Sequence, residues 1–154
     1  GKEYCGTGSY DSARTAMKGI LSELGIDTSY GCNLEDGSGL SRQNSISPDF
    51  MCRFLKAMTV SPGFEDYIGT FPSPGGNGTL AYIMKKYPQE VTGRIRMKSG
   101  SMNGVRCYCG YVIPAEGSKD DIIVFSIMTN NYFGSQSRLQ GALDRLIYLI
   151  ACGN

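Results

Sequence analysis

The sequence contains no histidine. Histidine is the side chain that most often moves a proton near neutral pH, and it is also the commonest metal ligand. Its absence excludes a Ser-His-Asp triad, a Cys-His dyad and any histidine-ligated metal site within this chain. If the chain takes part in hydrolysis, a lysine, tyrosine, aspartate or glutamate must carry the proton.

The sequence also lacks long runs of like charge and long runs of apolar residues. The 15 basic and 14 acidic residues give a net charge of +1 and are not clustered, whereas binding to nucleic acid needs clustered lysine and arginine. No apolar run reaches the roughly 18 residues that a membrane-spanning helix needs. We therefore expect no nucleic-acid partner and no membrane span in this chain. Because it opens on Gly1 without a signal peptide, we expect a mature product or an excised piece.

Six cysteines are present, but none of them forms a Cys-x-x-Cys pair, so no structural zinc site is expected. Six cysteines allow about fifteen complete pairings, and the sequence does not choose among them. We expect most of them to be buried thiols that act as small hydrophobic residues, with disulfides as the alternative if the protein is exported. Cys107 and Cys109 lie two apart on a predicted strand, which puts both side chains on one face.

Length and composition predict one globular domain over residues 1–154. The chain is 41% hydrophobic and 19% charged, and a chain of this length can bury roughly 70% of the surface of its unfolded state. Two amphipathic helices are predicted in the first part. One spans Asp11–Leu24 and stops at Gly25, and the other begins at Pro48 with Ser47 as its N-cap.

The remainder favours short helices followed by strands. Residues 61–79 are rich in proline and glycine and predict turns around a short helix, and Leu80–Tyr87 favours a further short helix. Three strands and a last amphipathic helix are then predicted from the change in periodicity, over Arg94–Lys98, Val105–Ile113, Ile122–Asn130 and Ser135–Ala151. Helices, an antiparallel meander and a closing helix on one sheet face make an α+β fold.

The first predicted strand ends in Lys98-Ser99-Gly100-Ser101. The ordinary interpretation of this stretch is a strand end with a solvated lysine. The functional one is an edge that binds a ligand, because lysine and a hydroxyl can hold a carboxylate and glycine lets a ligand backbone approach. An amide after the glycine can also stabilise an oxyanion.

A second polar stretch, "DGSGLSRQN", spans residues 36–44. Its Asp-Gly and Ser-Gly dipeptides are common in turns, and Asp36 can hold a turn by accepting backbone amides. Neither Ser38 nor Ser41 stands in a Gly-x-Ser-x-Gly nucleophile elbow. We therefore expect Asp36, Ser38 and Arg42 to form a structural loop near the site.

Three stretches together resemble a known family: "LEDGSGLSRQNSISPDFMCRFL", "FPSPGGNGTL" and "GRIRMKSGSMNGVRCYCGYV". They are similar, in order and spacing, to the D-Ala-D-Ala carboxypeptidase/endopeptidase branch of the low-molecular-mass penicillin-binding proteins. The resemblance runs from about Asp11 to Ala151. It implies a β-lactamase/transpeptidase-like domain in which an antiparallel sheet packs against helices, including the C-terminal one.

The resemblance also implies site residues. Family members use a Ser-x-x-Lys motif, a Ser-x-Asn motif and a Lys-Thr/Ser-Gly strand, without histidine. Lys98, Ser99 and Gly100 match the last motif as catalytic residues; Lys98 and Ser99 would bind the substrate carboxylate, and Ser101 would offer its amide to the oxyanion. No cofactor or metal is implied. The implied partners are peptidoglycan stem peptides and β-lactams, and the implied location is the periplasm or cell envelope.

The other two motifs are missing. The sequence has no Ser-x-x-Lys, and its Ser-x-Asn match, Ser101-Met102-Asn103, overlaps the third motif and reads as the hairpin turn. We therefore expect the C-terminal portion of a parent enzyme, whose missing N-terminal part is a partner and supplies the nucleophile. The alternative is a non-catalytic module that binds peptidoglycan peptides or another protein. The sequence encoded immediately upstream distinguishes the two.

Overall fold

The computed structural model of the chain describes residues 2–153. The chain forms two compact units, residues 1–60 and 61–154. That both units belong to one domain stays a prediction. Within the described residues, no helix has the length and apolar character that crossing a membrane requires.

The first unit is built mainly of helices. Its elements are α1 (Lys2–Cys5), α2 (Tyr10–Glu23), β1 (Cys32–Asn33), β2 (Ser45–Ile46) and α3 (Pro48–Thr59). Both predicted helices are confirmed. Gly25 has the left-handed backbone (φ +72°) expected after α2, and the Ser47 hydroxyl accepts a hydrogen bond from the Phe50 amide at 3.0 Å as the N-cap of α3.

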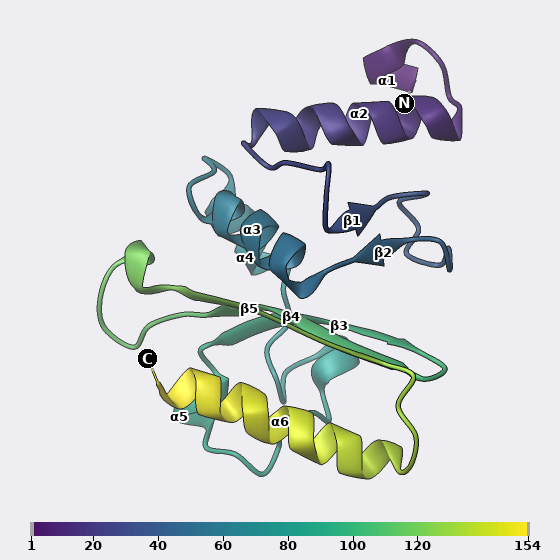
Figure 1. Cartoon of the computed structure of the whole chain (residues 1–154). Coiled ribbons are helices and arrows are strands. Elements are labelled where there is room, and N and C mark those ends of the chain that lie inside the picture. Colours follow the sequence, from purple (N-terminus) through teal and green to yellow (C-terminus); the bar gives the residue numbers. More distant parts are fainter. Residues whose placement is uncertain (1, 154) are drawn as a thin grey trace. The chain divides into compact units, whose positions relative to one another are not determined.

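The second unit contains the predicted meander. Its elements are α4 (Phe64–Gly69), the 3₁₀ helix η1 (Gly78–Leu80), α5 (Gln89–Thr92), β3 (Ile95–Met102), β4 (Val105–Val112), the 3₁₀ helix η2 (Lys119–Asp121), β5 (Ile123–Asn130) and α6 (Gln136–Cys152). The strands form one antiparallel sheet in the order β3-β4-β5, with β4 in the centre (Figure 1). The α+β fold, the three strands and the closing helix are therefore confirmed.

Helix α6 covers one face of this sheet (Figure 1). Ile95 and Met97 of β3 are fully buried in a core that includes Leu143 and Ile147 of α6. Side chains alternate between the two faces along a strand, so those of Arg96 and Lys98 belong to the face opposite α6. The burial of α6 residues therefore decides which face of β3 stays available.

One predicted element is absent. Residues 81–88 form turns, and the expected helix over Leu80–Tyr87 was wrong. Leu80 and Met84 are both buried, four residues apart, and this spacing imitates a helix. Met84 has a left-handed backbone (φ 58°), which a right-handed helix excludes. The two side chains reach the core from successive turns instead.

Two glycines of the β3-β4 pair differ in the space that a side chain would have. A Cβ on Gly110 would lie 2.1 Å from the carbonyl oxygen of Arg96 and 2.6 Å from the Cα of Met97, closer than any real contact. A Cβ on Gly100 would lie 3.8 Å from the Cβ of Cys107, an ordinary contact. Gly110 is therefore required by the sheet, whereas Gly100 is not.

We predict that Gly110→Ala lowers the free energy of unfolding by about 1–3 kcal/mol, because the strands must shift to admit the methyl group. Gly100→Ala is the matched control and should change it by less than about 1 kcal/mol. Urea unfolding of both variants measures the difference. Equal losses in the two variants would contradict this account of the β3-β4 packing.

Candidate functional site

Successive residues of β3 direct their peptide groups alternately toward β4 and toward the open edge of the sheet. The carbonyl of Arg94, just before β3, accepts from the amide of Ile113 at 2.9 Å, toward β4, whereas the amide of Met97 donates to the carbonyl of Pro72 at 3.0 Å. In an antiparallel pair, alternate residues direct their peptide groups to the same side. Ser99 and Ser101, which follow Met97 at this spacing, therefore direct theirs to the edge.

Lys98 places its charge at this edge. It pairs with Cys109 across the sheet, so its side chain belongs to the face opposite α6. The ammonium Nζ donates to the carbonyl oxygen of Ser99 at 2.6 Å, and the residue is exposed. In residues 2–153 no ion pair includes Lys98. Its positive charge is therefore available to an anionic ligand.

The hydroxyl groups come from the other side of the strand. Ser99 pairs with Tyr108 and Ser101 with Arg106, so both serine side chains alternate with that of Lys98. A serine hydroxyl and the Lys98 ammonium can therefore reach one ligand group only around the edge of β3. Gly100 adds no side chain to the Lys98 face, which leaves this face clear beside the ammonium.

Three titratable groups on the Lys98 side of the sheet are uncharged. Burial raises the pKa values of the Tyr67 and Tyr111 hydroxyls and of the Cys107 thiol, so none of them is charged at neutral pH. The Tyr67 and Tyr111 rings meet edge to face at 6.5 Å between centroids. These three groups therefore add no negative charge that would compensate Lys98.

The described part of the chain holds no cluster of three or more cysteine, aspartate or glutamate residues that would bind a metal ion. What the geometry offers is a lysine ammonium, two serines and two outward peptide groups along one strand edge. Such an edge can pair with an extended peptide and hold its carboxylate.

Comparison with known proteins identifies the family. Residues 1–147 match the D-Ala-D-Ala carboxypeptidase 3 (S13) family.

The chain belongs to the S13 family.

Named relatives agree with this assignment. The chain is 34% identical over 139 residues to a D-alanyl-D-alanine carboxypeptidase of Actinomadura sp., which covers 87% of this chain and 24% of the relative. It is 31% identical over 142 residues to the penicillin-sensitive carboxypeptidase A of Dictyostelium discoideum, covering 89% and 26%. It is 30% identical over 117 residues to the carboxypeptidase DacB of Haemophilus influenzae, covering 76% and 24%.

Solved structures show the same relationship. Penicillin binding protein 4 of Haemophilus influenzae superposes with a TM-score of 0.73 at 25% identity, over 91% of this chain and 32% of that one. The same protein in complex with a β-lactam gives 0.73 at 27% identity, over 92% and 33%. The S13 chain described above therefore spans about a quarter of the length of its curated relatives and about a third of these structures.

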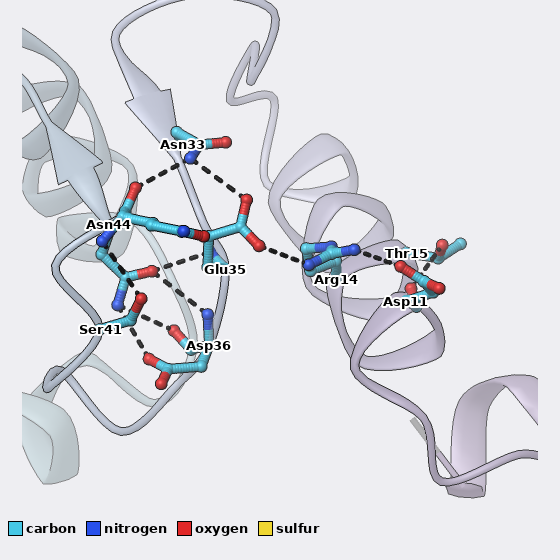
Figure 2. A network of polar contacts seen from close by, with 9 residues as sticks. Asp11, Arg14, Thr15, Asn33, Glu35, Asp36, Ser41 and Asn44 are labelled. Atoms are coloured by element: carbon cyan, nitrogen blue, oxygen red, sulfur yellow. Dashed lines mark hydrogen bonds and ion pairs between the residues drawn. The ribbon is translucent and has the colours of Figure 1, made fainter.

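The loop after β1 in this S13 chain is held by its own polar side chains (Figure 2). Asn44 is the centre: its Oδ1 accepts from the amides of Glu35 (2.8 Å) and Asp36 (3.2 Å), and its Nδ2 donates to Oδ1 of Asp36 at 2.9 Å. Arg14 of α2 donates to Glu35 at 2.6 Å and also binds Asp11. The network attaches the loop to α2 within the first unit.

Asp36 also closes a turn. It accepts from the amide of Ser38 at 3.2 Å and from its hydroxyl at 2.9 Å, while Arg42 is exposed. Hydrogen bonds from Asn44, and then from Ser38, hold the pKa of Asp36 below its usual value. Asp36, Ser38 and Arg42 belong to the first unit and Lys98 to the second, so their place beside the site stays a prediction.

Two features of the site were not predicted from the sequence. Pro72 occupies the edge of β3 at Met97, and Tyr67 with Tyr111 lies on the Lys98 side of the sheet. The place of Tyr111 had a signal in the sequence, because a two-residue turn at Asn103-Gly104 fixes which residues of the two strands share a face. The place of Tyr67, in α4, had none. The Pro72 contact had none, since it joins the strand to an irregular loop.

We predict that Asn44→Ala raises the pKa of Asp36 toward its ordinary value, because the largest cause of the lowered pKa is removed. A lowered carboxyl pKa stabilises the folded loop above the ordinary pKa, and this contribution is lost as pH falls through the lowered value. The wild-type loop should therefore keep its structure to a lower pH than the variant. Carboxyl titration by NMR measures both effects.

The control is Gln43→Ala, because the contacts of Gln43 in this network use only its backbone groups. It should leave the Asp36 pKa unchanged. An unchanged pKa in Asn44→Ala, or an equal rise in Gln43→Ala, would show that Asn44 does not hold the carboxylate.

Proposed function

We propose that this chain is the C-terminal portion of a serine-type D-Ala-D-Ala carboxypeptidase/endopeptidase that acts on peptidoglycan peptides in the periplasm or cell envelope. The observation that carries the proposal is the edge of β3. There Lys98 has no carboxylate partner within residues 2–153, and Ser99 and Ser101 turn their peptide groups outward. The relatives' names, which are those of D-alanyl-D-alanine carboxypeptidases, supply the reaction class.

The first task of this edge is to hold the substrate. The proposed ligand ends in a D-Ala carboxylate, which accepts hydrogen bonds from the Lys98 ammonium and the Ser99 hydroxyl. The preceding peptide lies along β3 and pairs with the outward amide of Ser99 and the outward groups of Ser101, since the Ser99 carbonyl already accepts from Lys98. Pairing ends at Met97, whose outward amide is already bonded to Pro72. Pro72 therefore sets one limit of the peptide-binding edge.

Its second task is electrostatic. Attack of a serine oxygen on the peptide carbonyl turns that carbonyl into an oxyanion, and the outward amide of Ser101 stabilises it by donating a hydrogen bond. The carbonyl then reforms as an acyl-serine ester while the terminal D-Ala leaves with a proton as a free amine. Water later hydrolyses the ester, which restores the serine and releases the shortened peptide.

The nucleophile comes from outside this chain. The sequence holds no Ser-x-x-Lys motif, so the attacking serine and the lysine that takes its proton belong to the N-terminal part of the same protein. In the complete protein, Lys98 is a positioned charge in a partly desolvated site, where its effect is much larger than at a solvated surface. The same assembly accounts for β-lactams as ligands, since they acylate the same serine.

We predict that Lys98→Ala in the complete protein slows acylation by a labelled penicillin and release of D-Ala by at least about 100-fold. The melting temperature should stay within a few degrees of wild type, because an exposed charge contributes at most about 1 kcal/mol to stability. Time courses of penicillin labelling and of D-Ala release measure the rates, and thermal unfolding measures the melting temperature. Lys85→Ala is the matched control, an exposed lysine of the same unit that lies against Tyr82, and should leave both unchanged.

Activity of Lys98→Ala within about threefold of wild type would mean that Lys98 is a plain strand end. The 154-residue chain alone gives a second result: it should form no covalent adduct with penicillin, because no activated serine is present. An adduct on this chain, detected by mass spectrometry, would show that it carries a nucleophile of its own. A complete protein that binds stem peptides without any acylation would favour the non-catalytic module.

A further inference from the structure

The second unit contains an open cavity of about 470 Å³ that the proposed function does not use. It lies between α4, the beginning of β3 and the segment that leads into β5. Apolar side chains form much of its lining, among them Phe64, Ile68 and Ile122, which are all buried. A volume of this size is in the range of small-molecule sites, which are largely apolar with a few placed polar groups.

The charged groups of the cavity are two cations and one carboxylate. Nζ of Lys119 lies 2.5 Å from Oε1 of Glu65, and both side chains are mostly exposed. This pair neutralises itself in solvent and contributes little. The positive charge that remains in the cavity is that of Arg96.

Arg96 is held in place by one nitrogen. Its Nη1 donates to the Ser73 hydroxyl, to the Gly93 carbonyl at 2.7 Å and to the Ile95 carbonyl at 3.1 Å. Its Nε and Nη2 have no hydrogen-bond partner among residues 2–153. Neither atom is among the buried polar atoms without a partner, so both remain open to a ligand. These two nitrogens form the side of the guanidinium that can donate two parallel hydrogen bonds to a carboxylate.

We propose that this cavity binds a small amphipathic carboxylate. The two carboxylate oxygens accept from Nε and Nη2 of Arg96, and the apolar part of the ligand lies against Phe64, Ile68 and Ile122. The anchored Nη1 fixes the guanidinium before the ligand arrives, which reduces the ordering cost of binding. The site uses none of the residues assigned to peptide hydrolysis and does not depend on that assignment.

The test is calorimetric titration of the complete protein with octanoate and with 1-octanol, which share a chain length and differ in charge. Octanoate should bind at least tenfold more tightly than 1-octanol, because the alcohol lacks the second acceptor and the charge. Arg96→Gln should weaken octanoate binding at least tenfold. Lys85→Gln, an exposed lysine against Tyr82 outside the cavity, should leave it unchanged.

A second variant keeps the test decisive if Arg96→Gln does not fold. Gly69 lines the cavity, and a Cβ there would have no atom within 4 Å, so Gly69→Leu fills the space without breaking the Arg96 contacts. It should abolish binding of octanoate. Equal affinity for octanoate and 1-octanol, no octanoate binding at millimolar concentration, or full binding by Gly69→Leu would each overturn the proposal.

Discussion

The pairing of β3 with β4 is the constraint on which the site depends. The two strands are joined by two residues, Asn103 and Gly104, and Gly104 adopts the left-handed backbone (φ 71°) that such a turn favours. Met102 lies opposite Val105, and the other pairs follow in order away from the turn, so Lys98 lies opposite Cys109. A shift of one residue would move Lys98 to the face under α6 and turn its peptide groups to the edge.

Burial fixes the same register independently. Ile95 and Met97 are enclosed in the core with Leu143 and Ile147 of α6, and exposing them would lose about 1.5–3 kcal/mol for each side chain. Residues buried on the α6 side therefore determine which side chains β3 presents on its exposed face. Gly110 belongs to this constraint too, since its missing side chain lets β4 approach the backbone of β3.

Local patterns in the sequence were enough for the elements that carry Lys98. The Asn103-Gly104 turn and the alternating apolar residues each act over a few residues, and the structure follows them. The failure at residues 80–87 has a different cause. The spacing of Leu80 and Met84 is produced by tertiary burial in successive turns, and local periodicity does not distinguish this from a helix. The bond between Pro72 and Met97 likewise arises only when a loop meets a strand.

The central claim is that β3 offers the outward amide of Ser99 and the outward peptide groups of Ser101 to a ligand. The Met97 amide is already bonded to Pro72 and the Lys98 backbone to β4. Amide hydrogen exchange at single-residue resolution tests this most directly in the complete protein. In the free protein the amides of Met97 and Lys98 should exchange slowly and that of Ser101 quickly, and acylation by penicillin should slow Ser101 alone among the three. Slow exchange of Ser101 in the free protein, or no change on acylation, would contradict the account.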